Sequence, residues 1–245
     1  MGVHPTAFLN ARLNMNKASL FLSVAVSLAV VFTVYAYASR TCTAESVTND
    51  RISAEAAQPA AVPVKGKVLV VYFTSPETDG VDTSSGASRI VADGKLYGST
   101  EYVAALISQK TGGDLFQIKT AHAYPGTHKE LLDASKREID AKARPKLTSH
   151  IQRLKDYDVI FVGFPNWWYD MPMPLYSFFD AYDFTGKTLI PFCTHAGSRF
   201  SQAEKTIAAL EKGAKMQKGL AISRKNLGEA ETAIQNWLQR MGFGK

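Results

Sequence analysis

Cysteine is scarce in this chain of 245 residues, since only Cys42 and Cys193 are present. Two cysteines cannot build the disulfide framework of a small secreted domain. Cys193 also stands inside the apolar run Leu189–Cys193, which is typical of a buried thiol. The five histidines lack the spacing of metal ligands, so the sequence predicts no metal site.

Several motifs of nucleotide binding and nucleophilic catalysis are missing as well. The chain has no G-x-G-x-x-G and no G-x-S-x-G, which argues against a dinucleotide fingerprint and a serine hydrolase. Gly186–Thr188 resembles the end of a P-loop, but Ala181 stands where the first glycine belongs. Cys193 and His195 would face the same way on a strand, yet no orienting carboxylate lies near them, which disfavours a thiol nucleophile.

Blocks of like charge are absent too. The formal net charge is +6, with basic and acidic residues interspersed along the predicted helices. The first 38 residues hold two of the 28 basic residues, Arg12 and Lys17, and none of the 22 acidic ones, so the remainder carries +4. Mild, dispersed basicity of this kind is not the footprint of a nucleic-acid partner.

Residues 1–38 are interpreted as a signal peptide or a membrane anchor. Ala18–Ala38 is an uninterrupted stretch of 21 apolar and small residues, and it ends in the small-x-small pattern of Ala36–Ala38. The length would suffice to span a bilayer, so cleavage and retention both stay open. We therefore expect an exported protein, periplasmic or membrane-anchored, that contacts a membrane only through this segment.

The rest of the chain divides into a linker and one domain. Residues 39–64 are rich in Ala, Thr, Ser, Glu and Pro and nearly lack large apolar side chains, so we expect a disordered linker. Residues 65–245 are long enough to bury a core of their own.

Within this domain, strand and helix patterns alternate five times. The alternation predicts an α/β fold with a doubly wound, five-stranded parallel sheet. The expected strands are 67–73, 115–118, 158–164, 188–194 and a weak one at 220–222. The expected helices begin at Ser99 or Thr100, at a capping box Thr127–Glu130, at Met173, at a second box Ser201–Glu204, and near Ala230.

An insertion, residues 76–97, separates the first strand from the first helix. Arg89–Tyr97 reads as a small hairpin, because Asp93–Gly94 suits a type I′ turn between apolar flanks. An isolated hairpin is marginal in water, so we expect this one to rest on the rim of the site. Arg89 or Lys95 would then approach a phosphate, or would simply be solvated.

Three loops at strand ends are the candidate site, because open α/β sheets bind ligands at the carboxyl ends of their strands. Hydroxyls and free N–H groups at a helix N-terminus favour a phosphate, although ordinary capping explains them too. Tryptophans in a loop suit a flat, partly polar ligand, unless both rings only cap the core. The candidate residues are Thr74, Ser75, Gly98, Ser99 and Thr100; Pro165, Asn166, Trp167, Trp168 and Tyr169; and Thr194, His195, Ala196 and Gly197.

These segments together resemble the flavodoxin superfamily, and most closely a flavodoxin-like family with the loops Y-F-S…G-N-T, G-x-P-x-W-W and F-x-T-H-x-G. The matching segments are Tyr72–Ser75, Gly98–Thr100, Tyr157–Trp168, Gly186–Thr188 and Phe192–Gly197, and the likeness runs from residue 67 to about 242. The resemblance implies strand order 2-1-3-4-5 and bound FMN. Two departures affect the phosphate end: the insertion interrupts that loop, and Ser99 replaces the usual Asn.

Carried over by position, the resemblance implies a role for each loop. Thr74, Gly98, Ser99 and Thr100 would hold the FMN phosphate, Pro165–Tyr169 would flank the isoalloxazine, and Thr194–Gly197 would approach its polar edge. Trp167 is preferred over Trp168 as the stacking ring. His195 would donate toward the reduced ring or would be structural.

Three functions follow from the resemblance. The first is an FMN-dependent oxidoreductase that passes electrons from NAD(P)H or a protein donor to a small acceptor such as a quinone. The second is a carrier flavodoxin without a substrate of its own, and the third is an exported binding module that has lost flavin. Carrier flavodoxins are strongly acidic, so the charge of +4 on residues 39–245 favours the enzyme.

Overall fold

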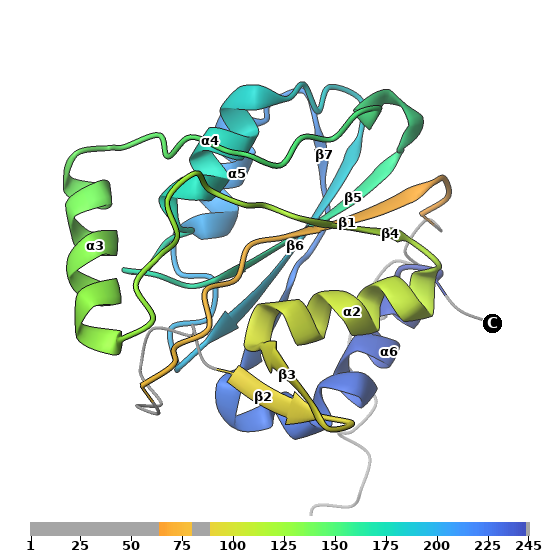
Figure 1. The fold of residues 1–245 in the computed structure, drawn as a ribbon. Helices are drawn as coiled ribbons and strands as arrows, with labels where there is room; N and C mark the ends of the chain where they lie inside the picture. Colours follow the sequence, from red (N-terminus) through yellow and green to blue (C-terminus); the bar gives the residue numbers. More distant parts are fainter. Residues whose placement is uncertain (1–63, 80–88, 244–245) are drawn as a thin grey trace, which may run out of the picture. The chain divides into compact units, whose positions relative to one another are not determined.

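The computed structural model describes residues 64–79 and 89–243 (Figure 1). The leader predicted for residues 1–38, and all but Val64 of the predicted linker, lie outside these ranges. In the described ranges, no helix is long and apolar enough to cross a bilayer.

A parallel sheet forms the centre of the fold, as the alternation of elements predicts. Its order is β4 (Asp114–Gln117), β1 (Val68–Tyr72), β5 (Val159–Pro165), β6 (Thr188–His195) and β7 (Lys215–Met216), with β8 (Leu220–Ser223) also paired to β6. Numbered along the parallel sheet, this is the order 2-1-3-4-5, so the predicted fold class is confirmed. Every residue of β1 and β5 is buried, which explains why these strands read as continuous apolar runs.

The predicted fifth strand is divided into two short pieces, β7 and β8, that pair with successive parts of β6. The Leu189 carbonyl accepts the Gln217 N–H at 2.9 Å, so this residue of β6 directs its backbone toward the β7 edge. Pro191, two residues further along, has the same orientation but no N–H to donate. The break between β7 and β8 therefore falls where β6 has lost a donor.

Helices cover both faces of the sheet (Figure 1). One face packs against α2 (Ser99–Thr111) and α6 (Ala230–Arg240), which is preceded by the 3-10 helix η2 (Arg224–Glu229). The other face packs against α3 (His128–Asp140), α4 (Met173–Ala181) and α5 (Ala203–Leu210). Because side chains alternate along a strand, neighbouring residues of β6 belong to different cores: Ile190 and Phe192 to the first, Leu189 and Cys193 to the second.

Both predicted capping boxes are wrong. The Thr127 hydroxyl donates to the Glu130 carboxylate at 2.6 Å and makes no bond to the backbone of α3. The first N–H of that helix, from His128, instead donates to Asp79 at 2.7 Å, a residue distant in sequence. A tertiary contact therefore replaces the local cap.

The second box fails for a different reason. Ser201 has φ 49° and its hydroxyl donates to the Ser198 carbonyl, so α5 begins only at Ala203 and without a side-chain cap. The helix ends at Leu210. Gly213 serves packing, because a Cβ there would lie 2.6 Å from the Thr185 hydroxyl.

Helix α2 begins at Ser99, as one of the two predicted positions, but its N-cap is Gly98 rather than a hydroxyl residue. The Gly98 N–H donates to the Glu101 carboxylate at 3.2 Å. Gly112 has φ 68° and ends the helix as the pattern predicts.

The inserted hairpin is confirmed, with strands β2 (Arg89–Ala92) and β3 (Lys95–Gly98). Asp93 has φ 51° and Gly94 has φ 72°, the two positive values of a type I′ turn. The hairpin lies beside α2 (Figure 1), and Ile90 packs against the core of that face. Lys95 places its ammonium over the ring of Tyr97, 4.3 Å from the centroid, and not beside an anion.

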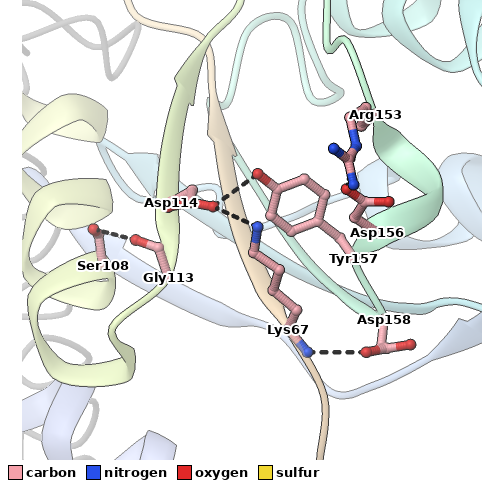
Figure 2. Close-up of polar contacts among 8 residues, drawn as sticks. All are labelled: Lys67, Ser108, Gly113, Asp114, Arg153, Asp156, Tyr157 and Asp158. Carbon is pink, nitrogen blue, oxygen red and sulfur yellow. Dashed lines mark hydrogen bonds and ion pairs between the residues drawn. The ribbon is translucent and has the colours of Figure 1, made fainter.

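Polar contacts connect the amino-terminal ends of the parallel strands (Figure 2). Asp114 accepts the Tyr157 hydroxyl at 2.8 Å and pairs with the Lys67 ammonium at 3.3 Å. Asp158 accepts the Lys67 N–H at 2.9 Å. The Tyr157 hydroxyl and the Lys67 ammonium lower the pKa of the Asp114 carboxyl. The three candidate loops lie at the other, carboxyl ends of the strands.

Candidate functional site

The residues expected to hold a phosphate meet at the N-terminus of α2. The Thr100 hydroxyl oxygen lies 2.7 Å from that of Thr194, so the first turn of α2 contacts the end of β6. A Cβ on Gly98 would lie 2.1 Å from the Thr74 hydroxyl, which shows how closely the first loop approaches this turn. Segments that are far apart in sequence are thus brought together as predicted.

Most of this cluster is buried, whereas Thr74 is half-buried. Ser99 and Thr100 are each 1% exposed and Ser75 is 8% exposed. The structure therefore places buried hydroxyls at the positive end of a helix, an environment that favours an anion. Glu77, three residues after Thr74, is only 3% exposed and adds a carboxylate to the same loop.

Glu77 is a residue that the sequence did not single out. Its carboxylate lies 3.0 Å from His128 Nδ1, at the first turn of α3. The Thr78 N–H donates to the Gly126 carbonyl at 2.7 Å, and Asp79 caps the same helix. Residues 77–79 therefore fix the start of α3 to the end of β1.

Trp168 and Tyr169 occupy the corners of a tight turn after β5. The Trp167 and Asp170 backbones bond to each other in both directions, at 2.9 and 3.0 Å. Trp168 has φ 53° and Tyr169 has φ 66°, the pattern of a type I′ turn, which normally requires Asn and Gly. Each bulky side chain in this region costs about 1–2 kcal/mol. The turn holds two aromatic side chains outward, 43% and 68% exposed, at a cost in backbone strain.

The carboxylate of Asp170 anchors this turn. It accepts the Met171 N–H at 2.8 Å, the Tyr176 hydroxyl at 3.0 Å and the Thr206 hydroxyl at 3.1 Å. Tyr176 belongs to α4, Thr206 belongs to α5, and Met171 directly follows the turn, so the turn is bound to two helices. Burial and the Asp170 charge raise the pKa of Tyr176 to about 12, which keeps this hydroxyl a donor.

The indole of Trp168 lies against α3. Its Nε1 donates to the Ser135 hydroxyl at 3.0 Å, and the Lys136 ammonium lies 5.9 Å from the ring centroid. Ser135 is 3% exposed, and its hydroxyl donates a hydrogen bond to the Leu132 carbonyl at 3.0 Å. No sequence pattern pointed to α3 as part of the site.

A cavity of about 550 Å³, here called the first cavity, opens between α3 and the loops after β5 and β6. Its volume is within the range of small-molecule and cofactor sites. The aromatic loop and the β6 loop face α3 across it. The lining residues are Leu131, Leu132, Ser135, Asn166, Trp167, Trp168, Tyr169, Ala196, Gly197 and Ser198.

Trp167 is a core residue with one edge on this cavity. It is 2% exposed, and its ring packs edge-on against Tyr124 at 5.3 Å and Phe73 at 5.6 Å. Its Nε1 is buried and has no hydrogen-bond partner in the part of the chain that the structure describes. The structure therefore disfavours Trp167 as the stacking ring, because Trp168 is the tryptophan with an accessible face.

His195 ends β6 and is 6% exposed. By strand alternation it shares the α3 face of the sheet with Cys193, whereas Thr194 faces α2. Its Nδ1 is buried, and none of residues 64–79 and 89–243 forms a hydrogen bond with it. Burial, with the nearby charge of Arg199, lowers the pKa of His195, so its ring is neutral at pH 7.

Asn166 joins the two loops that line the cavity. Its backbone N–H donates to the Thr194 carbonyl at 2.9 Å, and its side-chain amide donates to the Arg199 carbonyl at 2.8 Å. Pro165 pairs with Thr194 as the last register position of β5 and β6. Gly197 has open space where a Cβ would lie, so its backbone is accessible from the cavity.

Cys193 is 1% exposed, and burial raises the pKa of its thiol far above the ordinary value. A thiol held neutral in the core is a poor nucleophile, which supports the earlier rejection of that role. Among residues 64–79 and 89–243, no cluster of three or more His, Cys, Asp or Glu side chains could hold a metal ion.

Comparison with known proteins gives a family match over most of the domain. The profile of the flavodoxin family matches residues 88–241. No curated protein matches the chain.

Solved structures add three relatives. A protein from Bacteroides eggerthii, provisionally described as a flavoprotein, is 25% identical with TM-score 0.56, over 72% of this chain and 98% of that one. A similarly described protein from Bacteroides uniformis is 29% identical with TM-score 0.54, over 69% and 98%. A flavoprotein from Lactobacillus acidophilus, solved in complex with FMN, shares the fold at 16% identity and TM-score 0.50, over 71% and 99%.

Proposed function

The chain belongs to the flavodoxin family, and from this premise we propose that its first cavity binds the ring system of FMN and that the protein is an oxidoreductase. Bound FMN would supply the redox chemistry, accepting electrons from a donor and passing them to an acceptor. The protein's contribution is to bind the ring, orient it and exclude water. We take NAD(P)H or a protein as the donor and a small molecule such as a quinone as the acceptor.

The observation that carries this proposal is the strained turn of Trp168 and Tyr169 at the mouth of the first cavity. Two adjacent bulky residues with positive φ persist only where something compensates for their strain, and such outliers cluster at functional sites. The turn presents aromatic faces beside a cavity of about 550 Å³. A flat, partly polar ring such as isoalloxazine matches that surface, with Trp168 as the stacking partner.

Two buried nitrogens support a polar ring edge: one belongs to Trp167, which lines the first cavity, and the other to His195, which directly precedes the lining residue Ala196. Trp167 Nε1 and His195 Nδ1 have no hydrogen-bond partner among the described residues. A buried polar group without a partner costs about 1–3 kcal/mol, so a ligand that provides one gains affinity. The indole N–H would donate to a ring oxygen, and the neutral imidazole would donate to or accept from the ring at Nδ1. The backbone of Ala196 and Gly197 would approach the same edge.

The phosphate would lie at the N-terminus of α2, held by Thr74, Ser75, Gly98, Ser99 and Thr100. The helix end and its buried hydroxyls support an anion there, whereas the carboxylate of Glu77 opposes one. The ring end of the site is thus the better supported of the two.

Export is part of the proposal as well. The apolar segment Ala18–Ala38 supports a signal peptide or an anchor, which would place the domain outside the cytoplasm. An acceptor dissolved in a membrane would then be within reach.

The test is an FMN titration of the full chain, followed by tryptophan fluorescence and flavin absorption. Stacking on a flat ring contributes about 1–3 kcal/mol, so Trp168→Ala should weaken FMN binding about 10- to 100-fold and Trp168→Phe should restore most of it. Trp237→Phe is the control, because Trp237 is buried on the α6 face and its Nε1 donates to the Lys218 carbonyl. Absence of FMN binding would refute the proposal.

Turnover separates an enzyme from a carrier. An oxidoreductase should oxidise NADH or NADPH with a quinone present, at a rate that saturates with quinone. A flavin-bound protein that exchanges electrons only with a protein partner would instead be a carrier flavodoxin.

A further inference from the structure

A second cavity, of about 320 Å³, lies beside the first one and shares Trp168 with it. Helix α3 contributes to both, because Leu132 lines the first cavity whereas Ile139, two turns further along, lines the second. The Trp168 indole is bonded to Ser135, between these two positions. The Trp168 indole therefore lies between the two cavities.

The walls of the second cavity are apolar and polarizable. Ile139, Met171 and Met173 line it together with the ring of Tyr176 and the face of Trp168. Met171 and Met173 are buried, 1% and 6% exposed, so their side chains form a fixed floor. Thioethers next to aromatic rings provide a surface for a flat aromatic ligand.

Positive charge stands at the edge of this surface. Arg144 pairs with Asp180, and its guanidinium lies 5.0 Å from the centroid of the Tyr176 ring. Lys142 also lines the cavity, and its ammonium makes no ion pair with any residue in the described ranges. Lys142 is therefore the cation that is free to meet a ligand.

Among the described residues that line this cavity, Asp170 is the one acidic residue. Its oxygens accept hydrogen bonds from the Met171 N–H and from the hydroxyls of Tyr176 and Thr206. These neutral donors hold the carboxylate in place and leave its negative charge intact. The described lining therefore carries the two positive charges of Lys142 and Arg144 against the one negative charge of Asp170.

From this arrangement we infer that the second cavity binds the anionic part of an aromatic electron acceptor. The aromatic portion packs against Trp168 and the methionines, and the acid group meets Lys142. The inference rests on the proposed function, because the electrons would come from FMN in the first cavity. The chemical class it names is an aromatic acceptor that carries a sulfonate or carboxylate, an acidic quinone included, as opposed to an uncharged one.

Binding is tested with naphthalene-2-sulfonate and its neutral counterpart naphthalene-2-sulfonamide, titrated calorimetrically into the full chain with and without FMN. The sulfonate should bind more tightly than the sulfonamide. Lys142→Asn should weaken the sulfonate about fivefold, as for an exposed ion pair, and should leave the sulfonamide unchanged. Lys142 has φ 47°, a conformation that Asn tolerates, so this variant should fold normally.

Two further variants make the comparison specific. Lys142→Arg keeps the charge and should keep the affinity for the sulfonate. Lys155→Gln removes the same charge from the 3-10 helix η1 (Leu154–Asp156), which precedes β5 at the opposite edge of the sheet, and should change nothing.

Equal affinity for the two probes, or an unchanged sulfonate affinity in Lys142→Asn, would overturn the inference. Full competition between FMN and the sulfonate would overturn it too, because the probe would then occupy the first cavity. If the chain binds the sulfonate through Lys142 but no FMN, the subsite stands and the proposed function fails. If the chain binds FMN but its affinity for the sulfonate does not depend on Lys142, the proposed function stands and the subsite fails.

Discussion

The hydroxyl oxygens of Thr100 and Thr194 lie 2.7 Å apart, and both side chains are almost completely buried. This contact joins the first turn of α2 to the end of β6, which are separated by 94 positions in the sequence. It fixes the α2 N-terminus against the strand that leads into the first cavity. The contact therefore connects the proposed phosphate end of the candidate site, at α2, to the strand that leads into its ring end.

Removing this contact should destabilise the domain. Thr100→Val and Thr194→Val each lose a buried hydrogen bond and should lower the free energy of unfolding by about 1 kcal/mol. The double variant should lose less than the sum of the two, because the residues share one interaction. Urea unfolding of the four proteins of this cycle measures the coupling. Strict additivity would show that the two hydroxyls contribute independently.

Relieving the strained turn should stabilise the fold and impair the site. Tyr169 is 68% exposed with φ 66°, and Asn accepts that conformation readily. Tyr169→Asn should raise the free energy of unfolding by about 1 kcal/mol and weaken FMN binding. Tyr169→Phe, which keeps the strain and the aromatic face, should change neither. A destabilised Tyr169→Asn protein would contradict this account of the turn.

The buried imidazole of His195 should make stability pH-dependent. Burial and Arg199 lower the pKa of His195 in the folded protein below its ordinary value of 6.5. Below pH 6.5 the unfolded chain binds the proton first, so stability falls as the pH drops from there through the folded pKa. His195→Asn should flatten this part of the profile, measured by urea unfolding at several pH values between about 4.5 and 7.5. The same slope in both proteins would show that another group is responsible.

Glu138 should have the opposite dependence. Burial raises the pKa of this carboxyl, although the Tyr124 hydroxyl donates to it at 2.5 Å and acts against the shift. The folded protein therefore holds the proton more tightly than the unfolded chain, and stability falls as the pH rises through the folded pKa. Glu138→Gln should raise the melting temperature at pH 7 and leave it nearly unchanged at pH 4. Loss of stability at pH 7 would indicate that the charged carboxylate is favourable.

The cap of α3 should depend on Asp79 and not on Thr127. Asp79→Ala removes the acceptor of the His128 N–H and should cost about 1 kcal/mol, whereas Thr127→Ala should cost little. Since α3 forms one wall of the first cavity, Asp79→Ala should also weaken FMN binding. Thermal unfolding and FMN titration of both variants measure the two effects.

The parts of the fold that local sequence determines were predicted. The all-apolar runs of β1 and β5 indicate strands buried on both faces, and Asp93–Gly94 alone specifies the type I′ turn of the hairpin. The strand order came from the family resemblance, since apolar periodicity carries no information on neighbours.

The parts that depend on tertiary contacts were not predicted. The cap of α3 comes from Asp79, and no local pattern points to a donor and an acceptor that are 49 positions apart. Ser135 and the leucines of α3 read as an ordinary amphipathic helix until Trp168 is seen to bond Ser135. The tryptophan pair could be located but not ordered, because only the structure shows that Trp167 precedes the turn and is buried whereas Trp168 is its first corner and is exposed.

Asn166 binds the β5 loop to the β6 loop through both its backbone and its side chain, so these two walls of the first cavity move as one body. The opposite wall, α3, meets that body through the Trp168–Ser135 bond and is fixed to β1 by residues 77–79. The position of the Trp168 ring is therefore set by α3 as well as by its own turn. A substitution of Ser135 would change the aromatic surface that the first cavity offers to a flat ring, even though the aromatic side chains themselves stay the same.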